Sequence, residues 1–156
     1  FGTFRRKTSR GFIRIDGEWY RCDDEVIRPI IRADVLVSNG SWRRTEFLLD
    51  IWADRTVLTA TALSFFDSRD VLDESLLGGL GGSAESVEVD TVIRLMNEQG
   101  GPVTMRGRFA AVREFESLDM CVLGRDITRH FAVIVDQPQN VICLLSQRHR
   151  YRIESV

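Results

Sequence analysis

An acidic residue at the end of an apolar run is the feature of this sequence that could do chemistry. Asp50 directly follows Leu48-Leu49, and a second acid, Asp54, lies four residues further on. A carboxylate in such a position can take a proton from water, and a protonated carboxyl can donate one, which is general acid–base chemistry. Considered alone, an acid that ends an apolar strand is more often a turn residue than a catalyst. Asp50 therefore needs support from its surroundings.

Two further segments stand out by their composition. The run LLGGLGG over residues 76–82 is rich in glycine, which permits backbone conformations and close approaches that other residues do not. A flexible linker is the simpler interpretation of this run. The run VLGRD over 122–126 is apolar and enters a loop at Gly124, much as residues 48–66 enter a loop at Asp50. A crude internal two-fold is predicted from these two similar segments.

Other reaction classes lack their signatures in this chain. Serine does not occur in G-x-S-x-G, and the glycines form neither G-x-G-x-x-G after a strand nor a P-loop. A serine hydrolase and a nucleotide-binding site are therefore not expected. The three cysteines have no C-x-x-C spacing and there are two histidines, which is a poor set of zinc ligands. We expect no metal and no cofactor.

Three segments together resemble those of the retropepsins, the retroviral proteases and their cellular and bacterial relatives. In that family two hydrophobic residues precede Asp-Thr-Gly-Ala, and residues 48–53 here read Leu-Leu-Asp-Ile-Trp-Ala. The family then has a Gly-rich flap, to which residues 76–82 are similar. Near its end it has a hydrophobic strand, Gly and Arg-Asp or Arg-Asn before a short helix, and residues 122–127 match this. The resemblance covers roughly residues 28–146.

The resemblance implies a small all-β domain, a closed barrel of the acid-protease fold with one or two short helices, acting as a homodimer. Asp50 of each protomer would contribute to a catalytic dyad, in which one carboxyl stays protonated because two such close like charges cannot both ionise. The ionised carboxyl would activate a water while the other donates to the peptide carbonyl. The implied partners are a second copy of the chain and an extended peptide or protein substrate.

The same resemblance implies roles for the other site residues. The active-site loop after Asp50 would consist of Ile51, Trp52, Ala53 and Asp54. The flap that closes over the substrate would consist of Gly78, Gly79, Leu80, Gly81 and Gly82. Structural support would come from Gly124, Arg125 and Asp126. In the family the second acid of the motif pairs with the late arginine, which here implies an ion pair between Asp54 and Arg125.

The active-site loop departs from the family pattern at two positions. Ile51 stands where the family has threonine, whose hydroxyl would hydrogen-bond across the two-fold axis. Trp52 stands where the family has glycine, and a large side chain is expected to fit the tight turn poorly. A rearranged active site, a self-occluded site and a dead site kept for binding or dimerisation are all open. Trp52 could equally be a core aromatic residue.

Three functions are therefore weighed. The first is an aspartic endopeptidase that uses the Asp50 pair, and the second is a catalytically inactive retropepsin-like module for peptide binding or dimerisation. The third, a nucleic-acid-associated domain, is disfavoured by the formal net charge of −2 and by the lack of interleaved aromatic and basic residues. Ile51 and Trp52 favour the second function. The first is favoured by Asp50, Ala53 and Asp54 together with the Gly-rich run and VLGRD.

The elements that must position these residues are predicted to be strands. Apolar runs at 30–37 and 45–50 are joined by Asn39-Gly40, a strong hairpin signal. Residues 87–95 alternate between apolar and charged, as in a half-buried strand. Further strands are predicted at 103–112, 120–123, 131–136 and 141–145, and short helices at 59–66 and near 125–130.

The two ends of the chain are basic. Residues 1–27 are expected to form a basic N-terminal arm followed by a β-hairpin at Asp16-Gly17, and residues 28–156 the retropepsin-like domain, within one compact domain overall. The cluster RHRYR at 148–152 is expected to be a solvated terminal strand or part of an intersubunit sheet.

Composition and net charge constrain the size of the core, the classes of partner and the cellular compartment. With 156 residues, 44% of them hydrophobic and 28% charged, the chain can bury one substantial core. The near-neutral charge gives no reason to expect nucleic acid or an anionic membrane as a partner. An odd, sparse set of cysteines favours a reducing compartment, so a cytoplasmic location is predicted. No apolar run approaches the roughly 18 residues that span a bilayer.

Overall fold

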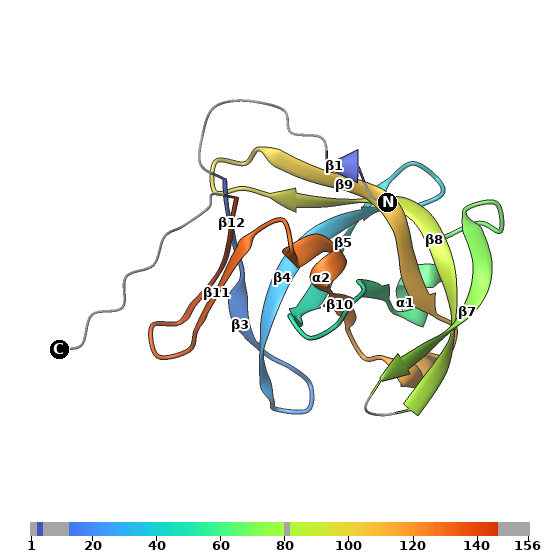
Figure 1. Ribbon diagram of the computed structural model, residues 1–156, viewed down its shortest axis with the longest axis horizontal. Coiled ribbons are helices and arrows are strands. Elements are labelled where there is room, and N and C mark those ends of the chain that lie inside the picture. Colours follow the sequence, from blue (N-terminus) through green and yellow to red (C-terminus); the bar gives the residue numbers. More distant parts are fainter. Residues whose placement is uncertain (1–2, 5–12, 80–81, 147–156) are drawn as a thin grey trace.

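A computed structural model of the chain describes residues 3–4, 13–79 and 82–146 (Figure 1). These residues form two β-sheets and two α-helices of four residues each, which confirms the all-β class with short helices. The larger sheet contains β1 (Thr3–Phe4), β3 (Glu18–Arg21), β4 (Ile27–Leu36), β5 (Trp42–Leu49), β6 (Val57–Leu58), β7 (Val71–Gly79), β8 (Gly82–Met96), β9 (Pro102–Val112) and β10 (Cys121–Leu123). The smaller sheet contains β2 (Arg14–Asp16), β11 (Ala132–Asp136) and β12 (Val141–Leu145). The helical segments are α1 (Ala60–Leu63), α2 (Arg125–Thr128) and the 3-10 turn η1 (Phe115–Ser117).

The larger sheet closes on itself. Its strands follow the order β1-β9-β6-β10-β5-β4-β8-β7, and β8 pairs with β9 as well as with β4. The six strands β9, β6, β10, β5, β4 and β8 therefore form a ring, which is the closed barrel that was predicted. Strand β3 extends the sheet beside β4, while the smaller sheet has the order β11-β12-β2.

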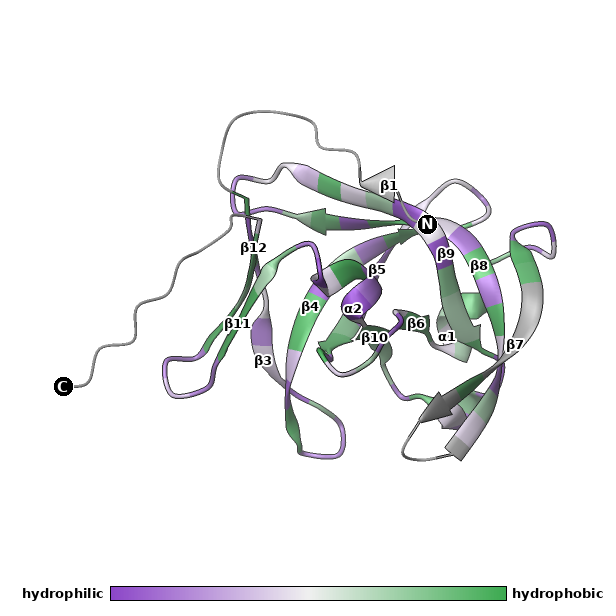
Figure 2. Ribbon diagram, viewed as in Figure 1, coloured by the Kyte–Doolittle hydropathy of each residue, from purple (hydrophilic) through white to green (hydrophobic). Residues whose placement is uncertain are grey.

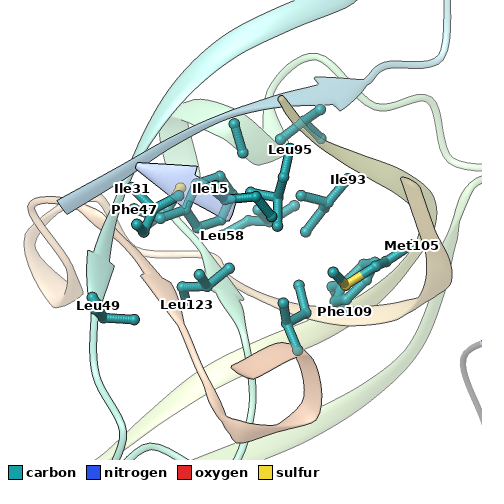
Figure 3. Packing of buried hydrophobic residues seen from close by; sticks show 14 of the residues in the cluster. Ile15, Ile31, Phe47, Leu49, Leu58, Ile93, Leu95, Met105, Phe109 and Leu123 are labelled. Atoms are coloured by element: carbon teal, nitrogen blue, oxygen red, sulfur yellow. The ribbon is translucent and has the colours of Figure 1, made fainter. Parts of the chain in front are cut away.

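The hydrophobic core lies inside this barrel. Figure 3 shows Phe47, Leu58 and Leu123 packed beside Ile93 and Leu95, and each of these side chains is fully buried. Strand β8 alternates between apolar and polar residues along its length (Figure 2). The predicted inward face of β8 is confirmed, because Val87, Val89, Thr91, Ile93 and Leu95 are all buried.

The turn at Asn39-Gly40 joins β4 and β5 as predicted. The two strands pair in antiparallel register from Ile30↔Leu48 to Leu36↔Trp42. Gly40 has a φ of +81°, which other residues adopt with strain, and its amide donates to the carbonyl of Val37 at 2.9 Å. This hairpin delivers β5 to the position where Asp50 begins the next loop.

The hairpin predicted at Asp16-Gly17 is wrong. Strand β2 pairs with β12 and strand β3 pairs with β4, so the chain passes from one sheet to the other at Gly17. A Cβ on Gly17 would overlap the carbonyl oxygen of Ile30, and the Gly17 amide donates to the carbonyl of Ile142 at 2.8 Å. Glycine is needed here because the two sheets approach each other closely. A tight turn also selects glycine, so the Asp-Gly sequence does not distinguish the two cases.

Both helices are single turns, shorter than predicted for the 59–66 segment. The Thr59 side chain caps α1 by accepting from the amide of Ala62 at 3.2 Å. Beyond the helix, the amides of Phe65 and Phe66 donate to carbonyls three residues earlier, so the helix tightens into turns.

Several predictions concern residues outside the described part of the chain. These are the basic residues of the arm at 5–10, the cluster at 148–152, and Leu80 and Gly81 of the Gly-rich run. Within the described part, no helix is long and apolar enough to cross a membrane. The described residues also contain no group of three or more potential metal ligands.

Candidate functional site

Asp50 lies where two parallel strands end together. Strand β10 pairs in parallel with β5, with Leu123 opposite Leu49, and it pairs in antiparallel fashion with β6 on its other side. The amide of Asp50 then donates to the carbonyl of Leu123 at 3.2 Å. The loop that starts at Asp50 is therefore anchored to the barrel at its first residue.

The two oxygens of the Asp50 carboxylate have different surroundings. Oδ1 accepts hydrogen bonds from the backbone amides of Trp52 at 2.9 Å and Ala53 at 3.2 Å. This is an Asx-type turn, in which the side chain replaces a backbone carbonyl and is itself fixed. Oδ2 receives no hydrogen bond from any described residue, so it is free to bind a water molecule or a second carboxyl.

A buried polar cluster closes the other end of the loop. Asp126 Oδ1 accepts from the Thr56 amide at 2.9 Å and from its hydroxyl at 2.6 Å, and the Thr56 hydroxyl oxygen accepts from the Gly124 amide at 3.1 Å. Thr56 is 0% exposed, so its amide and hydroxyl depend on this cluster for their hydrogen bonds. Thr56 was not singled out from the sequence, although it lies two residues after Asp54.

Backbone contacts fasten the middle of the loop to α2. The Arg125 amide donates to the Ala53 carbonyl at 2.8 Å, and the Asp126 amide donates to the Asp54 carbonyl at 3.2 Å. The expected ion pair between the Arg125 and Asp54 side chains is present. Both side chains are more than half exposed, so the pair contributes only about 0–1 kcal/mol. The buried Thr56–Asp126 cluster is the stronger attachment.

Gly124 makes this attachment possible. It is the N-cap residue of α2, with extended backbone, and a Cβ there would overlap the backbone carbonyl of Arg55. Any other residue would push α2 away from the loop.

Arg55 links the loop to the barrel wall. Its Nη2 lies 2.6 Å from Oε1 of Glu88 on β8, and the pair is partly buried. Because β8 continues from the β7–β8 hairpin, this pair connects the Asp50 loop to the strand that carries the predicted flap. The contact spans 33 residues in sequence, and no local pattern signals it.

Ile51 and Trp52 project away from the core. Ile51 is 45% exposed and Trp52 is 86% exposed, so the interpretation of Trp52 as a core residue is wrong. Among the described residues, positive φ outside glycine occurs at Glu25 and Asn140, so Trp52 meets no such strain. An indole this exposed covers little of its own chain.

The Gly-rich run belongs to a hairpin. Strands β7 and β8 pair from Val71↔Val89 to Gly79↔Gly82, with a bulge between Val71 and Glu74. Gly78, Gly79 and Gly82 therefore lie in paired strands, which overturns the flexible-linker interpretation for these residues. Leu80 and Gly81, at the tip, lie outside the described residues.

Cys121 is a potential nucleophile on β10, the strand that pairs with β5 beside Asp50. It is buried on β10, its sulfur accepts from the Thr59 amide at 3.3 Å, and burial raises the pKa of its thiol. A protonated, buried thiol is a structural group and not a nucleophile.

Comparisons with known proteins find similarity in structure only. No family model matches the chain, and no curated protein matches it. The chain is similar to the EIAV protease in complex with the inhibitor HBY-793, with 24% identity, a TM-score of 0.42, and 65% of this chain and 86% of that chain covered. It is also similar to a retropepsin-like aspartic protease from Rickettsia conorii, with 19% identity, a TM-score of 0.46, and 86% and 98% covered. At these values the likeness concerns the path of the chain, and activity has to be argued from the site.

Proposed function

We propose that the chain is one protomer of a homodimeric, retropepsin-like aspartic endopeptidase that uses Asp50 from each protomer. The observation that carries this proposal is the Asp50 carboxylate, with one oxygen fixed by two amides and the other without a hydrogen-bond partner among the described residues. Acid–base catalysis needs a second carboxyl, but Asp54 is paired with Arg125 and Asp126 is bound to Thr56. A second copy of the chain is the simplest source of that carboxyl.

In the dimer the two Asp50 carboxyls share one proton. The ionised carboxyl takes a proton from a water molecule, whose oxygen attacks the peptide carbonyl carbon, while the protonated carboxyl donates to the carbonyl oxygen. The tetrahedral diol then collapses: one of its hydroxyls returns a proton to the dyad, the leaving nitrogen takes the other proton from the dyad, and the C–N bond breaks. The dyad is left with one proton, as at the start. The amide hydrogen bonds to Oδ1 hold each carboxyl in place throughout.

The exposed apolar pair beside Asp50 supports dimerisation. Ile51 and Trp52 leave a large apolar surface in water in a single chain, and burial against a second copy would remove it. Two Trp52 indoles in contact across the axis would replace the missing threonine hydrogen bonds by apolar contact.

A non-catalytic role is the second candidate function. The residues that favour it are again Ile51, which offers no hydroxyl, and Trp52, whose bulk would lie next to the catalytic water. In that case the chain would bind an extended peptide or assemble with itself without cleaving anything. We also propose a reducing, cytoplasmic setting, which the free thiols of all three buried cysteines support.

Cleavage of a mixed peptide library between about pH 4 and 7, where a carboxyl dyad titrates, tests the proposal. The wild-type chain is compared with Asp50→Asn and with Asp23→Asn, a control at an exposed aspartate. Cleavage that is lost only in Asp50→Asn supports the peptidase, and cleavage that persists in Asp50→Asn overturns it. If only the double variant Ile51→Thr, Trp52→Gly cleaves, the natural chain is the non-catalytic module.

A further inference from the structure

A separate pocket lies at the end of β5 that is remote from Asp50. It has a volume of about 210 Å³ and lies between the start of β5, the end of β4 and helix α1. Its lining residues are Val35, Val37, Arg43, Arg44, Thr45, Thr59, Thr61, Ala62 and Phe65. Arg43 is near the start of β5 and Asp50 directly follows its last residue, so the two lie roughly 20 Å apart along the strand. The pocket is therefore distinct from the candidate active site.

The pocket lies at an open strand edge. Residues 43, 44 and 45 all line it, although consecutive strand residues point to opposite faces, so the pocket wraps around the edge of β5. Strand β10 pairs with β5 only at residues 47–49. Among the described residues, the first half of β5 therefore has a neighbouring strand on one side only, namely β4.

The lining is positively charged and contains no acid. Arg43 takes part in no ion pair with a described residue, and its guanidinium rests on the Phe65 ring at 3.5 Å. Arg44 reaches Asp34 only at 3.3 Å, and Asp34 is held more closely by Arg94 at 2.9 Å. Two guanidinium groups thus border a floor made by valine, alanine and phenylalanine side chains.

We propose that this pocket and the open edge of β5 bind an extended, acidic peptide segment. The segment adds as a strand beside residues 43–45, one of its apolar side chains enters the pocket, and its carboxylates pair with Arg43 and Arg44. A pocket of about 210 Å³ is smaller than the roughly 300–1,000 Å³ of typical small-ligand sites, and this size suits a single anchoring side chain. Three features together indicate this class of ligand: the open edge of β5, the positive charge of the lining and the small volume of the pocket.

An NMR titration of the isotope-labelled chain with two designed peptides tests this proposal. The probes are Ac-Glu-Val-Leu-Val-Glu-NH2 and its charge-reversed counterpart Ac-Lys-Val-Leu-Val-Lys-NH2, with phenylacetate as a small carboxylate. The acidic peptide is expected to shift the amides of residues 43–45 and 59–65, and to bind at least about tenfold more tightly than the basic peptide. Mass spectrometry checks that the peptides stay intact.

Three variants locate the binding site. Arg43→Glu is expected to weaken binding of the acidic peptide at least about tenfold, and Thr61→Phe, which fills the pocket from an exposed position, should do the same. Arg108→Glu is the matched control at an exposed arginine outside the pocket, and it should change the affinity less than about twofold.

Three outcomes would overturn the proposal. The first is an affinity for the acidic peptide that Arg43→Glu does not change. The second is amide chemical-shift changes that are confined to the loop at Asp50. The third is phenylacetate that binds as tightly as the peptide, which would indicate a site for small anions. The inference is independent of peptidase activity, since Asp50→Asn should leave the peptide affinity unchanged while it abolishes any cleavage.

Discussion

At the scale of single residues, the site is defined by which carboxylate oxygens near Asp50 already accept hydrogen bonds. Oδ1 of Asp50 accepts hydrogen bonds from the amides of Trp52 and Ala53, and Asp126, two residues after Gly124, accepts from Thr56. Neighbouring acids that are already bound cannot serve as a second catalytic group. This distribution of hydrogen bonds is why the proposed chemistry needs two chains.

The Thr56 hydroxyl is predicted to matter for stability. Thr56→Val keeps the shape of the side chain but leaves the Gly124 amide without its acceptor and removes one of the hydrogen bonds to Asp126, at a cost of about 1–3 kcal/mol in the free energy of unfolding. Urea denaturation measures this change. Thr104→Val, at a half-buried strand position, is the control and should change stability by less than about 0.5 kcal/mol. Equal effects of the two substitutions would contradict the role given to the cluster.

The cysteine side chains are predicted to be unreactive in the folded chain. All three are buried, and burial is the main cause that raises the pKa of the Cys121 and Cys143 thiols, so these groups stay protonated at neutral pH. Titration with a chromogenic disulfide reagent should find no rapidly reacting thiol in the native state and three after denaturation. A fast-reacting native thiol would show that one of them is accessible.

At the scale of elements, the critical contact is that of α2 with the Asp50 loop. The helix has four residues and too few internal hydrogen bonds to be stable alone. It is held by amide–carbonyl contacts with Ala53 and Asp54 and by the Thr56–Asp126 cluster. Loop and helix should therefore form, and be lost, together.

Gly124→Ala is predicted to break this contact. The added Cβ would overlap the Arg55 carbonyl, so we expect a loss of about 1–3 kcal/mol in stability together with loss of any peptidase activity. Gly40→Ala is the matched control, because a Cβ there meets no atom within 4 Å and the cost comes only from its positive φ, about 1 kcal/mol. Thermal unfolding and the library assay give the two readouts. Full activity in Gly124→Ala would mean that the loop does not depend on α2.

At the scale of the whole molecule, the apolar surface beside Asp50 is predicted to drive self-association. Trp52→Ala should raise the dissociation constant of the dimer at least about tenfold, since a large aromatic side chain would be lost from the centre of the interface. Phe115→Ala, at another exposed aromatic residue, should have little effect. Analytical ultracentrifugation over a range of concentrations measures both. A wild-type chain that stays monomeric at high concentration would contradict the proposed dimer and, with it, the shared dyad.

Local features of the fold were determined by the sequence itself. Strand positions, the inward face of β8 and the Asn39-Gly40 turn depend on residues within one segment, and each of these predictions is confirmed. The motif around Asp50 and the Asp54–Arg125 pair could also be anticipated, because the resemblance to a family supplied a long-range contact that no local pattern contains. The roles of these residues in catalysis are still predictions.

Only the tertiary structure decided which segments meet. The Asp16-Gly17 pair suggested a hairpin because a tight turn and a close approach between sheets both select glycine, and pairing with β12 far along the chain resolved the choice. The Thr56–Asp126 cluster and the Arg55–Glu88 pair likewise join residues that are distant in sequence. The pocket at the start of β5 exists because β10 is too short to cover that edge. Such contacts follow from how the barrel closes, and closure is a property of all its strands at once.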